Sequence, residues 1–313
     1  MVTTALIEKW KKMLSHKSIL HVKQGKGEFF SAENQFGYYN DLRDKVRYTV
    51  NRDGEGIPFN IAAHGNEKKN IYFPVAVFQY GLGAYDLYLE TREPRYHTAM
   101  IKMADWAVAY QQEEGAWDTF GSLRYVNPYS SMAQGEGASL LARAYKETGD
   151  EKYRASCERA IDFMLKPRDQ GGCADYEGDK IILFEYPHKS PVLNGWIFSA
   201  FGIFDAWKIT GDQKYRKTWE DTLKGIERYL PEFDAGHWSY YDMSRKYASP
   251  FYHELHIALM KALAELDGKP TWEHYIHKWT KCRDSAIRRR IAFMMKAMQK
   301  IAEKKSDEWV IIA

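Results

Sequence analysis

The chain has 313 residues, of which 45% are hydrophobic and 28% are charged, and its formal net charge is +3. These values are typical of a globular protein with a sizeable core and exclude a mainly disordered chain. They give no support to nucleic-acid binding, because the Lys and Arg residues are spread along the sequence.

Aromatic residues make up 15% of the chain and include 22 Tyr and 10 Trp. Their flat apolar faces and polar tips suit sugar-binding clefts as well as thick cores. The three cysteines have no metal-ligand or CxxC spacing, so we expect reduced thiols. We expect neither a signal sequence nor a membrane span, and therefore a cytoplasmic protein without a membrane partner.

Residues 1–70 are expected to form a region that packs on the main domain. Apolar residues at helical spacing predict a short amphipathic helix over residues 4–15. Val46, Tyr48 and Val50 alternate with polar residues before the turn sequence NRDGEG, and this pattern predicts a β-hairpin.

An internal repeat dominates residues 71–313. The signatures TREPRY, TGDEKY, TGDQKY and the fainter DGKPTW start at Thr91, Thr148, Thr210 and Asp267, so the intervals are 57, 62 and 57 residues. Each signature precedes a helix with a one-sided apolar stripe and follows a helix that is apolar or small on nearly every side. About four such pairs build an inner ring inside an outer ring. The sequence therefore predicts a mainly α protein with an incomplete α/α toroid at residues 71–313.

Three loops rich in Gly and aromatic residues lead from the outer helices back to the inner ones. Because they recur in register, we expect all three at one rim of the toroid, where function is expected. The titratable candidates on the second and third loops are Glu185, Tyr186, His188, Tyr240, Tyr241, Asp242, Arg245, Tyr252, His253 and His256.

The chemistry of this set favours proton transfer at a sugar. His253 and His256 have i,i+3 spacing and no evident third ligand, so no metal is predicted. A Ser hydrolase is not favoured, because the GxSxG motif is absent. The pKa of a phenol is near 10, and neighbouring cations stabilise its ionised form. As a base, such a phenol suits the removal of a proton from a weakly acidic carbon next to a carboxylate, as in uronic acids.

Several segments together resemble a known family. FPVAVFQYGLGAYD, MAQGEGASLLARAY, FEYP followed by NGWIFSAFGIFDAWKITGD, YYD and ASPFYHELHIALMKAL occur in this order over roughly residues 35 to 265. They resemble the C-terminal catalytic domain of D-glucuronyl C5-epimerases. The resemblance implies epimerisation of D-glucuronate to L-iduronate in a heparan-type polymer without an external cofactor.

The resemblance also implies roles for individual residues. Glu185 and Tyr252 would act on opposite faces of C5, and Tyr186 and Tyr241 would orient or stabilise the intermediate. Arg245 is displaced by one position from the family's basic residue. The residues expected to bind an acidic polysaccharide are Tyr38, Tyr39, Gln134, His188, Asn194, Arg245, His253 and His256.

Other interpretations remain open. The chain is expected to be a prokaryotic-type homologue without the family's extra N-terminal domain, and whether it is a monomer or a homodimer is left open. An α/α toroid also hosts uronate lyases and glycoside hydrolases. An inverting hydrolase would need a second carboxylate beside Glu185, for which Asp118 and Asp242 are candidates. A non-catalytic glycan-binding protein would keep the aromatic cleft.

Overall fold

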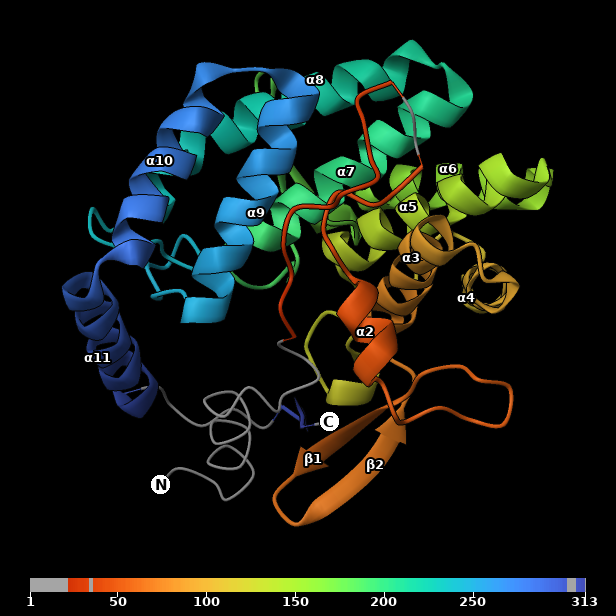
Figure 1. Cartoon of the computed structure of the whole chain (residues 1–313), viewed down its shortest axis with the longest axis horizontal. Coiled ribbons are helices and arrows are strands. Elements are labelled where there is room, and N and C mark those ends of the chain that lie inside the picture. The colour runs from red at the N-terminus through yellow and green to blue at the C-terminus, as the bar shows by residue number, and fades with distance from the viewer. Residues whose placement is uncertain (1–21, 34–35, 303–307, 313) are drawn as a thin grey trace.

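A computed structural model describes residues 22–33, 36–302 and 308–312 (Figure 1). The helix predicted over residues 4–15 lies outside the described residues. The main body consists of successive helix pairs. These are α3 (Pro74–Thr91) with α4 (Pro94–Tyr110), α5 (Ser131–Thr148) with α6 (Glu151–Met164), α7 (Leu193–Thr210) with α8 (Gln213–Tyr229), and α9 (Pro250–Asp267) with α10 (Pro270–Asp284).

The first helix of each pair belongs to an inner layer. α5 packs between α3 and α7, and α7 also packs on α9. Every residue of α7 from Leu193 to Ala206 is buried, whereas α8 buries one stripe of its surface. Figure 1 shows α3, α5, α7 and α9 in an arc with their partners outside. The predicted incomplete α/α toroid is confirmed.

The signature turns end the inner helices as predicted. Gly149, Gly211 and Gly268 follow α5, α7 and α9 with φ of 69°, 70° and 70°, the left-handed conformation that costs glycine least. Arg92 takes the same position after α3 with φ 61°. The first signature, TREPRY, therefore ends its helix in the same conformation without a glycine, and the fainter DGKPTW does so through Gly268.

Small residues let two inner helices approach closely. A Cβ atom added to Gly202 of α7 would lie 2.5 Å from the Cα atom of Gly135 in α5. The backbones of α5 and α7 are therefore in direct contact, which draws the inner layer together at the centre of the fold.

The N-terminal region differs from the prediction. Residues 43–48 form helix α2 (Arg43–Tyr48) instead of a strand. The predicted turn at NRDGEG does form, with an antiparallel bridge between Arg52 and Pro58, and a hairpin of regular strands comes later, as β1 (Asn60–His64) and β2 (Glu67–Ile71). The alternation of Val46, Tyr48 and Val50 was misleading, because Tyr48 and Val50 are exposed. Leu42 and Val46, four residues apart, instead lie against Gly83 of α3.

The strands form two small sheets. β5 (Val310–Ile311) pairs antiparallel with β1, so the first sheet has the order β2-β1-β5. β3 (Ala174–Glu177) and β4 (Lys180–Leu183) form a hairpin within the loop from α6 to α7. Helix α11 (Ala286–Ala302) follows α10. The described helices include none with the length and apolar character needed to span a membrane.

Candidate active site

A cavity of about 210 Å³ lies at the mouth of the toroid. It is bounded by the N-terminal turns of all the inner helices, by residues of the first two loops and by the C-terminal strand β5. Its lining residues include Val75 and Gln79 of α3, Met132 of α5, Asn194 and Phe198 of α7, Phe251, Tyr252 and Leu255 of α9, Tyr125, Glu185, Tyr186, Lys45 and Trp309.

Glu185 follows β4 and lies on the backbone of α7. The side chain is 7% exposed, and its Oε2 atom has no hydrogen-bond partner among the described residues. Burial raises the pKa of Glu185 to about 7, and the hydroxyl of Tyr186 and the charge of Lys189 oppose the rise. A carboxyl group with this pKa is ionised in part at neutral pH and can both take up and release a proton.

Three phenols accompany this carboxyl group. The ring of Tyr241 lies 4.8 Å from that of Tyr252 between centroids, and the ring of Tyr186 stacks on Phe120 at the same distance. Burial, followed by the charge of Glu185, raises the pKa of Tyr186, Tyr241 and Tyr252. All three are therefore neutral at neutral pH and are suited to donate a proton.

Backbone contacts fix the loops that carry these groups. The Ser131 N–H at the start of α5 donates to the Phe184 carbonyl, one residue before Glu185. The Leu193 N–H at the start of α7 donates to the Tyr241 carbonyl. The second and third loops are thus attached to adjacent inner helices, which brings Tyr241 and Glu185 to one rim as predicted.

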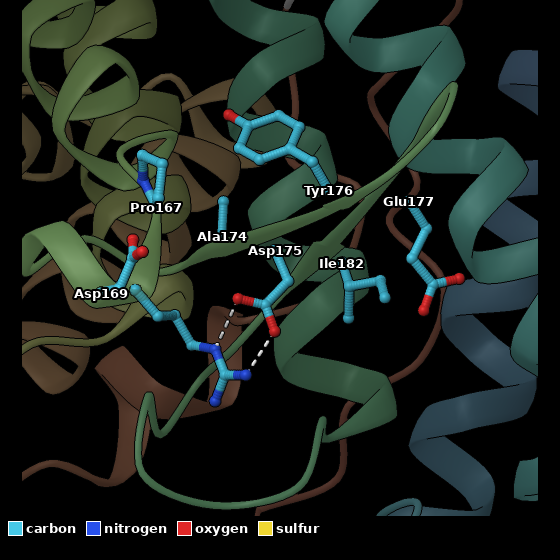
Figure 2. Close-up of a pocket in the computed structure, with 8 residues that line it drawn as sticks. Pro167, Asp169, Ala174, Asp175, Tyr176, Glu177 and Ile182 are labelled. Carbon is cyan, nitrogen blue, oxygen red and sulfur yellow. Dashed lines mark hydrogen bonds and ion pairs between the residues drawn. The ribbon is translucent and has the colours of Figure 1, made fainter.

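The hairpin β3–β4 supports the Glu185 loop from behind. Figure 2 shows a shallow pocket beside this hairpin, with Asp175, Tyr176 and Glu177 on its first strand. Arg168 forms an ion pair with Asp175, donates to the Pro187 carbonyl at 2.8 Å and lies 3.7 Å above the Phe184 ring. Because Arg168 contacts residues on both sides of Glu185 and Tyr186, it restricts their movement.

Gly195→Ala is expected to reduce turnover while the protein stays folded. A Cβ atom at Gly195 would lie 2.5 Å from Glu185 Oε2 and 2.6 Å from its Cβ, so the added methyl group must displace the carboxyl group. A misplacement of about 1 Å can lower a rate about a hundredfold. The measurement is kcat on a glucuronate polymer, with circular dichroism as the test of folding. Wild-type kcat in Gly195→Ala would show that the position of Glu185 is not critical.

The other residues expected to bind substrate lie in several places. Asn194 lines the cavity, and its buried Oδ1 atom has no hydrogen-bond partner among the described residues. His188 stands edge-on to the Tyr125 ring, with centroids 5.8 Å apart. Gln134 is fully buried and braces the first loop, accepting from the Trp117 N–H and donating to the Gly115 carbonyl. The structure does not bring Gln134 to the cavity.

Tyr38 and Tyr39 belong to the opposite end of the toroid. The Tyr38 N–H donates to Asp86 near the end of α3, and the Tyr39 hydroxyl donates to Asp205 near the end of α7. Both rings are buried in the core. They close the far end of the inner ring and do not line the cavity.

Arg245, His253 and His256 also lie outside the cavity lining. Arg245 has a side chain that is 68% exposed and pairs with Glu232. The Nδ1 atoms of His253 and His256 lie 2.8 and 3.0 Å from the Ser239 hydroxyl, in a buried cluster where burial lowers both pKa values. In the described part of the chain, no group of three or more His, Cys, Asp or Glu residues could hold a metal ion.

Most residues that line the cavity were not predicted as site residues, and two of them, Lys45 and Trp309, come from distant parts of the chain. Lys45 reaches it from α2, and the spacing of Leu42 and Val46 was the available signal for that helix. Trp309 reaches the cavity because β5, near the C-terminus, pairs with β1, near the N-terminus. No local pattern in the sequence indicates this long-range pairing.

Comparison with known proteins identifies the family. A sequence model of the D-glucuronyl C5-epimerase C-terminus matches residues 102–281, which is more than half of the chain. The chain belongs to the D-glucuronyl C5-epimerase family. The matched region contains helices α5 to α9 and therefore most of the inner layer of this family member. It also contains Glu185, Tyr241 and Tyr252.

Two relatives align with the central part of the chain. A D-glucuronyl C5-epimerase of Caenorhabditis elegans is 28% identical over 220 residues, covering 61% of this chain and 35% of the relative. An uncharacterised protein of Methanocaldococcus jannaschii is 32% identical over 194 residues, covering 58% of this chain and 63% of the relative. The chain thus matches less than two thirds of the length of either relative.

A solved structure supports the fold. Cellobiose 2-epimerase from Bacillus thermoamylovorans superposes with a TM-score of 0.53 and 12% identity, over 77% of this chain and 69% of that enzyme. At this level of identity the likeness shows a shared fold alone.

Proposed function

We propose that the protein is an epimerase that inverts C5 of D-glucuronate residues to L-iduronate in an unsulfated glucuronate polysaccharide. The observation that carries the proposal is the cavity itself. It combines a carboxyl group whose pKa lies near 7, on the loop before α7, with the neutral phenol of Tyr252 at the start of the inner helix α9. Epimerisation requires a proton acceptor and a proton donor on opposite sides of one carbon.

The proposed reaction has two proton transfers. The Glu185 carboxylate takes the C5 proton, and the electron pair of the broken C–H bond delocalises into the adjacent substrate carboxylate. Tyr252 then gives its hydroxyl proton to the opposite face of C5, and exchange with solvent restores both groups. Tyr186, which lines the cavity, and Tyr241, whose ring packs against that of Tyr252, would stabilise the charged intermediate by hydrogen bonding. This scheme uses no external cofactor.

Glycoside hydrolysis is less well supported. Glu185 is the only carboxylate among the described residues that line the cavity. The two partners considered from sequence have structural roles, since Asp118 accepts from the Gly121 N–H and Asp242 accepts from the Ser244 hydroxyl. An inverting hydrolase needs a second carboxylate placed to activate water.

A lyase would share the first step but would then expel the C4 substituent. Incubation with the polymer distinguishes the two reactions. We expect no ultraviolet absorbance from an unsaturated product and no shortening of the chains. An absorbing, shortened product would identify a lyase, and an unchanged polymer that binds tightly would identify a glycan-binding protein.

The pH dependence follows from the pKa of Glu185. The ionised form is the proton acceptor, so kcat/KM should increase with pH up to about 7 and then level off. Below that pH it should fall about tenfold per unit, because the protonated carboxyl group cannot accept the C5 proton. The measurement is kcat/KM across this range. A profile whose acid limb is centred near the ordinary pKa of glutamate would contradict the assignment of Glu185.

A further inference from the structure

Ser239, His253 and His256 form a buried hydrogen-bond network beside the candidate site. All three residues are fully buried, and the described residues that line the cavity include none of them. The Ser239 hydroxyl lies 2.8 Å from His253 Nδ1 and 3.0 Å from His256 Nδ1, and the Ser239 N–H donates to His253 Nδ1 at 3.2 Å. Because these groups lie outside the cavity, they do not touch a bound substrate.

The donors and acceptors of this network determine where its protons lie. His253 Nε2 is 3.0 Å from the Trp279 carbonyl, which can only accept, so Nε2 carries the proton. His253 Nδ1 therefore accepts, and at 2.8 Å the Ser239 hydroxyl must donate to it. The Ser239 oxygen in turn accepts from His256 Nδ1. Both rings are neutral in this arrangement, and any displacement would leave a buried donor or acceptor unpaired.

The network joins the third loop, between α8 and α9, to the residues next to Tyr252. In an extended segment, side chains two positions apart point to the same side. Ser239 and Tyr241 accordingly both face α9. Ser239 contacts His253, and the Tyr241 ring contacts that of the preceding residue Tyr252, with centroids 4.8 Å apart. A shift of Ser239 would therefore move Tyr241 relative to Tyr252.

A second contact attaches the same loop to a different helix. The Leu193 N–H at the start of α7 donates to the Tyr241 carbonyl at 3.2 Å. The network attaches Ser239 to α9 and, through the Trp279 carbonyl, connects to α10. Attachments to two inner helices fix the orientation of the loop as well as its position.

We propose that this network positions Tyr241 against Tyr252 in the geometry needed for return of the proton to C5. Ser239, His253 and His256 are then positioning residues, because they act through the two phenols. The inference rests on the proposed function, which assigns the returned proton to Tyr252. A buried polar network suits this task, because hydrogen bonds are directional and a displaced partner is left unsatisfied.

The test is the kinetics of C5 deuterium incorporation by Ser239→Ala in the full chain. The substitution removes the hydroxyl that joins the two histidines and adds no atoms. Misplacement of the phenols should lower kcat about 10- to 100-fold. KM should stay unchanged, because the network does not bind substrate. His256→Leu should lower kcat in the same direction, and the double variant should lose no more than Ser239→Ala alone, because both changes break one network.

Ser156→Ala is the matched control. Ser156 is fully buried on the outer helix α6, and its hydroxyl donates to Gln111 Oε1 at 2.7 Å. Removing this hydroxyl should lower the free energy of unfolding in urea by a similar amount but leave kcat unchanged. The inference is overturned if Ser239→Ala keeps the wild-type kcat, if its KM rises while kcat does not fall, or if Ser156→Ala loses as much kcat.

Amide hydrogen exchange without substrate separates this inference from the proposed function. Ser239→Ala should accelerate exchange in residues 239–248, where the Tyr241 N–H donates to the Lys246 carbonyl, and leave α6 unchanged. Unchanged exchange in residues 239–248 would overturn the inference. Failure of the proposed function gives a different pattern. In that case the wild type shows no deuterium incorporation at C5, while the loop of Ser239→Ala still exchanges faster.

Discussion

Glu185→Gln is expected to lower C5 proton exchange about a thousandfold while binding of the polymer is retained. The amide has the shape of the carboxyl group and fits beside Gly195, but it cannot accept the C5 proton. Loss of a general base typically costs about 10²- to 10⁴-fold in rate. The measurement is deuterium incorporation at C5 in heavy water, followed by proton NMR, with affinity measured in parallel.

Glu254→Gln is the matched control for this substitution. Glu254 is an exposed residue of α9, two positions after Tyr252, and the same chemical change there should leave exchange unaltered. If Glu185→Gln exchanges as fast as Glu254→Gln, then Glu185 is not the proton acceptor. If Glu185→Gln also fails to bind the polymer, the residue contributes to recognition rather than to proton transfer alone.

Asp205→Asn is expected to destabilise the fold by about 3–5 kcal/mol, the usual cost of breaking a buried ion pair from one side. Asp205 and Arg143 are both fully buried, and their charged atoms lie 2.7 Å apart. Asp205 also accepts from the Tyr39 hydroxyl, and Arg143 donates to the Gly37 carbonyl at 2.9 Å. The substitution leaves the guanidinium charge uncompensated. The free energy of unfolding in urea measures the effect.

An exposed pair provides the comparison. Arg216 and Glu220 are four residues apart on α8, each with a side chain that is 52% exposed. Glu220→Gln should change the free energy of unfolding by only about 0.5 kcal/mol, because water screens such pairs. Equal effects of Asp205→Asn and Glu220→Gln would show that the buried pair does not hold the far end of the toroid.

The toroid could be predicted because its signal is local and repeated. Each inner helix carries apolar residues on all sides and each outer helix carries one apolar stripe, so four repeats of one pattern reinforce one another. The N-terminal hairpin was misplaced because a five-residue alternation resembles a strand. What decides residues 43–48 is contact with Gly83 of α3, and no property of the segment alone reveals that contact.

The candidate site could be predicted where it depends on the ends of inner helices. Asn194 and Tyr252 lie in the first turns of α7 and α9, and Glu185 and Tyr186 lie in the loop that leads into α7, so all four line one cavity. The presence of a titratable side chain was a weaker indication that a residue belongs to the site. Among the histidines, His253 and His256 are buried around Ser239. The cavity lysine comes instead from α2, whose position depends on long-range packing.

The central claim is that the protein inverts C5 of glucuronate by two-sided proton transfer. The most direct measurement is proton NMR of an unsulfated glucuronate polymer incubated with the wild-type protein in heavy water. The account predicts L-iduronate residues that carry deuterium at C5, in chains of unchanged length. A polymer that binds but acquires neither deuterium at C5 nor iduronate would contradict it.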